Sequence, residues 1–288
     1  MTAVTYSGRV IDLHSHILPG VDDGAHTLDE SLALGRAAAS RGVTAIAATP
    51  HVRADYPTSV DTMEQGVDAL RKAFASGDVP VEVLHGGEME IDALLALDED
   101  TVTRFTIGQT GRYLLVEFPY FGWPFALDGL IHSLRRWGIT PLLAHPERNP
   151  EIQEQPTRIE SAVDAGALVQ VTVGSISGEF GRGARRAVDR LLDVGCVHVI
   201  ASDVHRPGGR DQDLALAGEA VGGGALGRYL TDEAPGSIAA GNPVAPPPRR
   251  RARGLASVLD GLRRFAFLDQ SGKRTLSADG FPTSGSTS

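Results

Sequence analysis

The sequence predicts an α/β fold in which parallel strands alternate with helices and close into a barrel. Short apolar runs that contain β-branched residues recur along the chain, and such runs are typical of buried strands. Stretches with helical character separate them, and this alternation is typical of a parallel sheet. Six of the runs lead directly into histidine, aspartate or glutamate. The seven predicted strands are 10–13, 45–48, 81–84, 113–116, 141–144, 167–172 and 197–201.

Helices are expected between these strands. Thr27 and Glu30 have the spacing of a capping box, in which each side chain binds a free backbone N–H at the start of a helix. Gly42 is placed to end that helix. Further helices are expected at 58–76, 126–137, 157–165 and 181–194.

Length and composition fit a globular protein with a sizeable core. The chain has 288 residues, of which 42% are hydrophobic and 22% charged, which allows one large barrel or two small domains. No stretch approaches the ~20 consecutive apolar residues of a membrane span, and the start lacks the apolar segment of a signal peptide. Cys196 is the only cysteine, which excludes an intramolecular disulfide and a thiolate metal cage. A cytoplasmic location is therefore expected.

The composition changes near Asn242. Residues 1–242 are expected to form the barrel, and residues 243–288 a largely disordered tail, first rich in proline and arginine and then in glycine and serine. One amphipathic helix is expected within this tail, around 255–265. The tail contains 8 Arg/Lys and 3 Asp/Glu, whereas the body contains 19 and 33. The acidic body argues against nucleic-acid binding. The basic tail leaves open a transient contact with an acidic membrane surface or partner.

Nine polar side chains at or just beyond the predicted strand ends form a candidate metal site. The carboxyl ends of parallel strands open onto one face, so these side chains should meet. Charged groups in that position must be paired or metal-bound, because burying them alone is too costly. The candidate ligands are His14, His16, Asp23, His51, Glu88, Glu117, His145, Asp203 and His205.

The donor set indicates which metals to expect. Histidine and carboxylate without sulfur suit Mn²⁺, Fe²⁺ or Zn²⁺ better than Mg²⁺ alone. Nine ligands are too many for one ion and enough for two or three. The other histidines are expected to be structural; they are His26, His85, His132 and His198.

Two arginines closely follow candidate ligands, Arg148 after His145 and Arg210 after His205. A guanidinium binds phosphate bidentately and keeps its charge beside cations. A surface salt bridge is the alternative for each. Their place beside the metal loops favours phosphate binding.

Other chemistries with similar residues fit less well. A cysteine-dependent tyrosine phosphatase needs arginine six positions after its cysteine, and Cys196 has Ser202 there. Amidohydrolases often bridge two metals with a carbamylated lysine, but only Lys72 and Lys273 are present, neither at a strand end. A serine hydrolase elbow of the form Gly-x-Ser-x-Gly is also missing from the sequence.

Residues 11–24, IDLHSHILPGVDDG, resemble the opening of the PHP (polymerase and histidinol phosphatase) superfamily. More narrowly, they resemble the manganese-dependent tyrosine phosphatases encoded with bacterial capsular and exopolysaccharide genes. The likeness covers roughly 10–242 and leaves the tail outside. It continues through ATPH at 48–51, GGE at 86–88, Glu117, HPER at 145–148, and SDVH at 202–205 with Arg210.

The resemblance implies a distorted seven-stranded (β/α)7 barrel that holds three Mn²⁺ ions. His14, His16, Glu88 and Asp203 would hold the first ion. Glu88 would bridge to a second, which Glu117 and His145 complete, and Asp23, His51 and His205 would hold the third. Arg148 and Arg210 match the family's phosphate-contacting arginines.

The implied function is a metal-dependent phosphotyrosine protein phosphatase that acts on a tyrosine kinase of polysaccharide export. Metal-activated water would be the nucleophile. Asp23 or His51 would assist protonation of the leaving group. Trp123, in a loop with other aromatic residues, is a candidate for lining the ring pocket, with packing as a lid the alternative. A small-molecule phosphatase of histidinol-phosphate type and a non-catalytic metal-binding regulator stay open as alternative functions.

Overall fold

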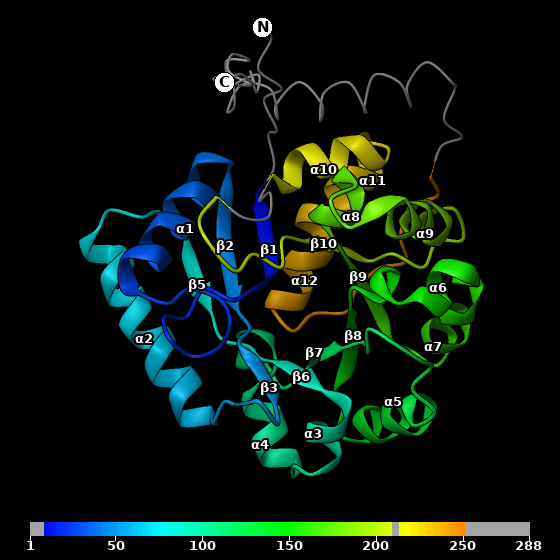
Figure 1. Ribbon diagram of the computed structural model, residues 1–288, viewed down its shortest axis with the longest axis horizontal. Coiled ribbons are helices and arrows are strands. Elements are labelled where there is room, and N and C mark those ends of the chain that lie inside the picture. Colours follow the sequence, from blue (N-terminus) through cyan, green and yellow to red (C-terminus); the bar gives the residue numbers. More distant parts are fainter. Residues whose placement is uncertain (1–8, 209–212, 251–288) are drawn as a thin grey trace, which may run out of the picture. The chain divides into compact units, whose positions relative to one another are not determined.

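The computed structural model describes residues 9–208 and 213–250, and it contains all seven predicted strands. Helices connect them, as Figure 1 shows, and the neighbouring predicted strands that pair do so in parallel. The parallel α/β arrangement is confirmed. The strands are β1 (Val10–Ser15), β2 (Val43–Ala48), β5 (Glu82–Leu84), β7 (Tyr113–Glu117), β8 (Thr140–Ala144), β9 (Leu168–Thr172) and β10 (Val199–Ala201).

The strands form two sheets, and a continuous ladder around a closed barrel is not found within 9–208 and 213–250. One sheet has the order β1-β2-β5 and the other β10-β9-β8-β7-β6-β3-β4. The added strands are β3 (His51–Arg53), β4 (Tyr56–Pro57) and β6 (Glu88–Glu90). Pro50 separates β2 from β3, and proline cannot donate to a strand ladder. The chain therefore passes from one sheet to the other at this point.

The two sheets meet around one core. Alternate residues of strands from both sheets point into the same buried cluster, among them Leu13 of β1, Leu115 of β7 and Ala201 of β10. Ile238 of α12 (Ala234–Ala239) packs in the same cluster. A single parallel bridge between Ser15 and Val204 joins the first strand to the segment after the last. The carboxyl ends of β1 and β10 are thereby held side by side.

The five predicted helical regions are confirmed. Thr27 caps the first helix by accepting a hydrogen bond from the Glu30 backbone N–H, and the Glu30 carboxylate accepts one from His26. The helices are α1 (Leu28–Ser40), α2 (Val60–Ser76), α5 (Leu127–Arg136), α7 (Glu160–Asp164, after a 3₁₀ turn at Pro156–Ile159) and α9 (Gly181–Asp193). None of the helices in the described part of the chain is long and apolar enough to cross a membrane.

The sequence did not predict the shorter helices. Most have only five to eight residues, too few to show a helical period. They are α3 (Ile91–Leu95), α4 (Glu99–Arg104), α6 (Pro150–Glu154), α8 (Val173–Ser177), α10 (Leu214–Val221), α11 (Gly224–Arg228), a π-helical turn (Tyr229–Glu233), α12, and 3₁₀ turns at Ile107–Gln109 and Pro146–Arg148.

Contacts with the body continue beyond Asn242, the expected boundary, as far as Arg250. The Tyr229 hydroxyl donates to the Ala245 carbonyl at 2.6 Å. The Arg250 guanidinium is largely buried and binds Asp189 at 2.6 Å and Asp193 at 3.0 Å. Segment 243–250 is therefore attached to the body at Tyr229 and, through Arg250, at α9. The amphipathic helix expected around 255–265 lies outside the described residues, as does most of the tail for which a contact with an acidic surface was left open.

His198 is a structural histidine, as expected, and it makes the fold sensitive to acid. Its Nδ1 accepts the Val169 backbone N–H at 3.2 Å, and burial lowers its pKa to about 4 from an ordinary 6.5. Between these two values the unfolded chain binds a proton that the folded chain does not. The contribution of neutral His198 to the free energy of unfolding is therefore complete above pH 6.5, and it is lost as the pH falls toward 4.

We expect His198→Asn, which keeps an acceptor near Nδ1, to flatten this acid dependence. The difference in unfolding free energy between pH 6.5 and 4 should shrink by on the order of 3 kcal/mol. Thermal unfolding of both proteins in a chelator across this range checks the prediction without a metal contribution. Parallel pH profiles for the two proteins would refute it.

Candidate metal centre

All nine predicted ligands lie close together at the carboxyl ends of the strands. Their donor atoms form four overlapping groups, and within each group all atoms lie within 4.8 Å of one another. The groups are His16–Asp23–His51–His205, His14–Glu88–His145, His14–His16–Asp203 and His51–Glu88–Glu117. Because the groups share members, they form one continuous cluster of nitrogen and oxygen donors.

Glu88 is the centre of this cluster. Its buried carboxylate lies 2.9 Å from His51 Nδ1 and 2.9 Å from His145 Nε2. His14 Nε2 and His16 Nε2 are 3.4 and 3.3 Å from the same carboxylate. Burial alone would raise the pKa of Glu88, but the neighbouring histidines, His14 above all, hold it well below its usual value. Glu88 is therefore ionised and shared among several donor groups.

The pKa of Glu117 is shifted in the opposite direction to that of Glu88. Burial, followed by the charge of Glu88, raises its pKa. Adjacent carboxylates with opposed pKa shifts are typical of functional sites, where negative charge is concentrated beyond what packing requires. A nearby cation would stabilise both carboxylates in the ionised form.

The group His16–Asp23–His51–His205 contains the least buried ligands. Asp23 Oδ1 lies 3.5 Å from His51 Nε2 and 3.4 Å from His205 Nε2. The His16 and His205 rings stack with their centroids 4.0 Å apart. A hydrogen bond with His205 is the main cause that lowers the pKa of Asp23. This side of the cluster is open to solvent, because 39% of the Asp23 side chain is exposed.

A second set of residues orients the histidines, and the sequence did not single them out. Asp22 Oδ2 lies 2.7 Å from His16 Nδ1, and Gln170 Oε1 lies 3.1 Å from His14 Nδ1. Each contact ties one ring nitrogen and directs Nε2 into the cluster, as in carboxylate–histidine–metal arrangements. In the sequence, only the adjacent pair Asp22 and Asp23 could have indicated this role for Asp22. One aspartate of such a pair can bind a metal while the other orients a histidine ligand.

Gly24 allows this loop to fold tightly. Its N–H donates to Asp22 Oδ1 at 2.9 Å, and a Cβ atom at this position would lie 2.1 Å from the His16 carbonyl oxygen. Any side chain here would displace the backbone of a candidate ligand.

Asp12 connects the first and last strands below the cluster. Its buried carboxylate accepts hydrogen bonds from the Ser202 backbone N–H at 3.0 Å and from the Ser202 hydroxyl at 2.5 Å. Burial raises its pKa despite these bonds. Ser202 precedes Asp203, so this contact sets where the last ligands stand relative to His14.

Two candidate ligands have left-handed backbone conformations. His145 has a φ of 40° and Asp203 a φ of 52°. Neither residue is glycine, and such conformations are sparsely populated and cost of order 1–3 kcal/mol each. They are maintained because these backbone turns aim both side chains into the cluster.

The residues present fit divalent cations. Three buried atoms of the cluster, His51 Nδ1, Glu88 Oε2 and His145 Nδ1, form no hydrogen bond of regular geometry within the described structure, although His51 Nδ1 and Glu88 Oε2 lie only 2.9 Å apart. The Nε2 atoms of His14 and His16 face each other at 3.2 Å. Buried polar atoms are ordinarily paired, so this convergence is explained by cations between the donors. The nitrogen and oxygen donor set suits Mn²⁺, Fe²⁺ or Zn²⁺.

Arg148 lies beside the cluster. Its Nη1 donates to Asp203 Oδ2 at 3.2 Å and to the Tyr120 hydroxyl at 3.0 Å. The guanidinium also lies over the rings of Tyr120 and Phe180, at 4.6 and 4.3 Å. Its Nε and Nη2 form no hydrogen bond within the described residues, and they remain available for an anion. Arg210, the second predicted arginine, lies outside the described residues.

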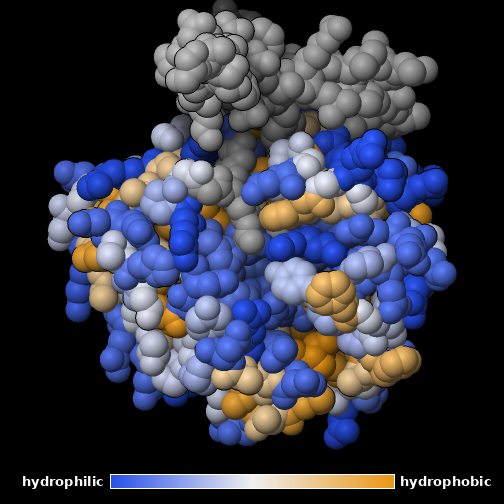
Figure 2. Space-filling view, viewed as in Figure 1, coloured by the Kyte–Doolittle hydropathy of each residue, from blue (hydrophilic) through white to orange (hydrophobic). Residues whose placement is uncertain are grey.

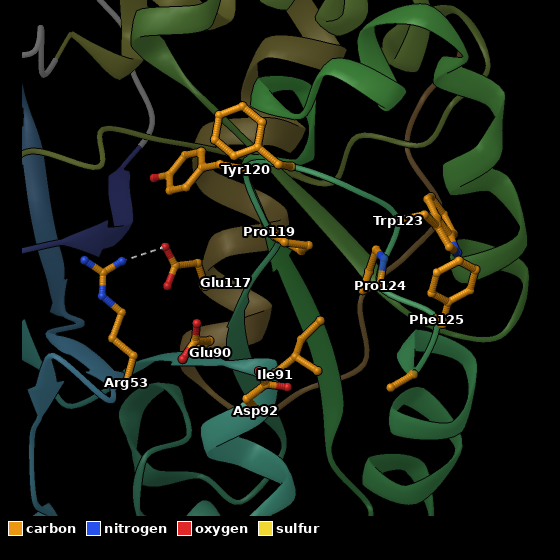
Figure 3. A pocket seen from close by; sticks show the side chains of 12 residues that line it. Arg53, Glu90, Ile91, Asp92, Glu117, Pro119, Tyr120, Trp123, Pro124 and Phe125 are labelled. Carbon is orange, nitrogen blue, oxygen red and sulfur yellow. Dashed lines mark hydrogen bonds and ion pairs between the residues drawn. The ribbon is translucent and has the colours of Figure 1, made fainter.

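A groove of about 510 Å³ begins at the cluster and runs between α3 and the loop before α5. Figure 3 shows Arg53 and Glu117 at one end and Trp123 with Phe125 at the other. Trp123 packs edge-on against Phe118, and the Arg158 guanidinium lies 4.3 Å from its ring centre. Trp123 therefore lies on a groove wall.

Arg53 was missed by the sequence analysis. It belongs to β3, which continues β2 beyond Pro50, and its Nη1 donates to Glu117 Oε1 at 3.2 Å. It brings a positive charge to the edge of the metal cluster. The basic residue two positions after His51 was the only signal.

We expect Asp22→Asn to weaken metal binding without destroying the site. The amide lacks the charge that fixes the His16 ring, and loss of such outer partners typically costs 10–100-fold in metal affinity. The dissociation constant for Mn²⁺, measured by titration calorimetry, should rise by about this factor, with full occupancy at saturating metal. The exposed Asp29→Asn is the matched control. An unchanged Mn²⁺ titration would refute the role of Asp22.

Comparison with known proteins connects this cluster to a family. Residues 10–230 match the family described as capsular polysaccharide synthesis, CpsB/CapC. The tyrosine-protein phosphatase YwqE of Bacillus subtilis is 36% identical over 197 residues, which are 68% of this chain and 77% of YwqE. The tyrosine-protein phosphatase CpsB of Streptococcus pneumoniae is 28% identical over 204 residues, 68% of this chain and 83% of CpsB.

A solved structure shows the same fold. It comes from work on YwqE of Bacillus subtilis and CpsB of Streptococcus pneumoniae, described as unique metal-dependent tyrosine phosphatases. It superposes with a TM-score of 0.75 at 31% identity, covering 85% of this chain and all of that one. On the matched residues and this structural agreement, the chain belongs to the CpsB/CapC family of capsular polysaccharide synthesis.

Proposed function

We propose that this protein is a metal-dependent phosphotyrosine protein phosphatase. The observation that carries the proposal is a continuous cluster of nine nitrogen and oxygen donors with the Arg148 guanidinium beside it. The cluster provides binding for cations, and the guanidinium provides binding for the phosphoryl group. The tyrosine-protein phosphatases YwqE and CpsB support the reaction class.

The proposed cofactor is Mn²⁺, with three ions bound. Following the family pattern, His14, His16, Glu88 and Asp203 would hold one ion, and Glu88, Glu117 and His145 a second. In the structure, the donor atoms of His145 group with His14 and Glu88, and those of Glu117 with His51 and Glu88. Asp23, His51 and His205 would hold the third. When bound, such cations neutralise phosphoryl charge and lower the pKa of water to near neutrality. Fe²⁺ and Zn²⁺ suit the same donors.

The protein's own groups position the phosphoryl oxygens. Arg148 is held between two aromatic rings with Nε and Nη2 directed away from its Asp203 contact, so a phosphate can accept two parallel hydrogen bonds. Burial raises the pKa of Tyr120, which keeps its hydroxyl protonated and able to donate. Arg210 is proposed as the second phosphate-binding arginine.

Departure of the tyrosine phenolate requires little help from a general acid. Phenolate, with a pKa of about 10, is a better leaving group than an alkoxide. Of the two residues proposed for this step, Asp23 is held ionised by its hydrogen bond with His205, which suits a ligand. His51 is likewise a proposed ligand of the third ion, so Asp23 and His51 stay joint candidates for this step. Trp123 is proposed to contact the phosphotyrosine ring.

The proposed physiological substrate is a phosphorylated tyrosine kinase of the polysaccharide export machinery, and the proposed location is the cytoplasm. We further propose that the two sheets are one distorted seven-stranded (β/α)7 barrel, interrupted at Pro50. The shared core and the bridge between Ser15 and Val204 support this.

Phosphate release from a phosphotyrosine peptide, with and without Mn²⁺, tests the proposed function. A phosphoserine peptide and histidinol phosphate serve as competing substrates, and His14→Ala controls for contaminants. We expect metal-dependent turnover that favours phosphotyrosine and is lost in the variant. Preference for histidinol phosphate would establish the small-molecule alternative. Bound metal without turnover on any substrate would favour the non-catalytic regulator.

A further inference from the structure

The groove between α3 and the loop before α5 continues from the metal cluster. Glu117, a candidate ligand in the cluster, and Arg53, its ion-pair partner at the edge of the cluster, both line the groove. A phosphotyrosine bound at the cluster would therefore bring the neighbouring substrate residues toward this groove. This argument rests on the proposed function.

One wall of the groove is aromatic and unusually exposed. Phe125 is 97% exposed and Phe121 82%, and Trp123 stands between them in sequence. Figure 2 shows hydrophobic residues gathered on the lower part of this face, beside a hydrophilic centre. Single exposed aromatic residues are common, but several along one groove are typical of a binding surface.

The opposite wall carries negative charge. Figure 3 shows Glu90, Ile91 and Asp92 along this side, at the junction of β6 and α3. Neither carboxylate forms an ion pair or a side-chain hydrogen bond with any residue in 9–208 or 213–250. Both are therefore available to a ligand. A basic side chain is the complementary group.

We propose that this groove binds the substrate polypeptide next to its phosphotyrosine and selects both an apolar and a basic side chain there. The apolar side chain would pack on Phe125, and the basic side chain would pair with Asp92 and Glu90. An extended segment fits the arrangement, because alternate residues of a strand point to opposite sides. The groove thereby gives the enzyme preference among phosphotyrosine proteins.

Four phosphotyrosine peptides of equal length test the preference for a basic side chain and the preference for an apolar side chain. They differ only in the residues flanking the phosphotyrosine, which are lysine, glutamate, leucine or glycine. For the wild type with Mn²⁺, we expect kcat/KM to favour lysine over glutamate by about fivefold, the factor that ~1 kcal/mol gives. Leucine should be favoured over glycine by about tenfold.

Two variants address the walls separately. Asp92→Lys should reverse the preference between the lysine and glutamate peptides, and Phe125→Ser should remove most of the leucine preference. Asp100→Asn and Leu95→Ser are matched controls, because both residues are exposed and neither lines the groove. The controls should keep the wild-type preferences. Preference ratios within one protein also cancel any general loss of activity.

The outcomes separate this proposal from the proposed function. Equal kcat/KM on all four peptides, together with metal-dependent turnover of free phosphotyrosine, would overturn the groove proposal alone. The same holds if Asp92→Lys leaves the lysine preference intact. Absence of turnover on the peptides and on free phosphotyrosine would instead overturn the phosphatase assignment.

Discussion

Glu88→Gln is expected to reduce kcat/KM for a phosphotyrosine peptide by at least about 10³-fold, or ~4 kcal/mol of transition-state stabilisation. The carboxylate touches His14, His16, His51 and His145, and it belongs to two of the four donor groups. Glutamine keeps the shape but removes the charge and one oxygen donor. Metal bound per chain should fall together with activity.

Metal analysis after dialysis, paired with steady-state kinetics, checks this result. Glu82→Gln is the matched control, because Glu82 is exposed on β5, the strand that precedes β6 in the chain. Circular dichroism establishes that the variant is folded. A variant with full metal content and activity within tenfold of wild type would show that Glu88 is not the shared ligand.

Arg148→Lys is expected to reduce kcat/KM by about 10²-fold, or ~2.7 kcal/mol, with metal content unchanged. Lysine keeps the charge but loses the planar fork that binds two phosphate oxygens. It also loses the stacking on Tyr120 and Phe180 that fixes the guanidinium. Inorganic phosphate should therefore inhibit the variant more weakly.

The inhibition constant of inorganic phosphate separates this role from a structural one. Arg158→Lys is a suitable control, since Arg158 also lies over an aromatic ring, that of Trp123. Equal phosphate inhibition of the wild type and Arg148→Lys would exclude Arg148 from phosphate binding. Loss of metal from the variant would instead assign its main role to the contact with Asp203.

Strand periodicity and strand ends were enough to predict much of this molecule. Apolar runs such as 113–116 have a clear length and β-branched composition, and the structure places strands at all seven. Because parallel strands end on one face, nine residues spread between His14 and His205 could be grouped without coordinates. The structure brings all nine together.

The residues that were missed act through tertiary contacts, which the local sequence does not encode. Gln170 looked like an ordinary strand residue, yet its side chain meets His14 across 156 positions. Arg53 reaches the site only because β3 continues beyond Pro50 into the second sheet. The extension of the body to Arg250 depends on Asp189 and Asp193 of α9, which nothing near Arg250 indicates. Contacts of this kind join residues that only the folded topology brings together.

The contact between Asp12 and Ser202 has a consequence for how the protein is made. The two residues are 190 positions apart, so at typical synthesis rates of 5–20 residues per second roughly 10 to 40 s separate their exit from the ribosome. During that time His14 and His16 have left the ribosome without Asp203, which follows Ser202. A cation captured by the nascent chain would meet only part of its ligand set. The complete set of candidate ligands therefore exists only after Asp203 and His205 have left the ribosome.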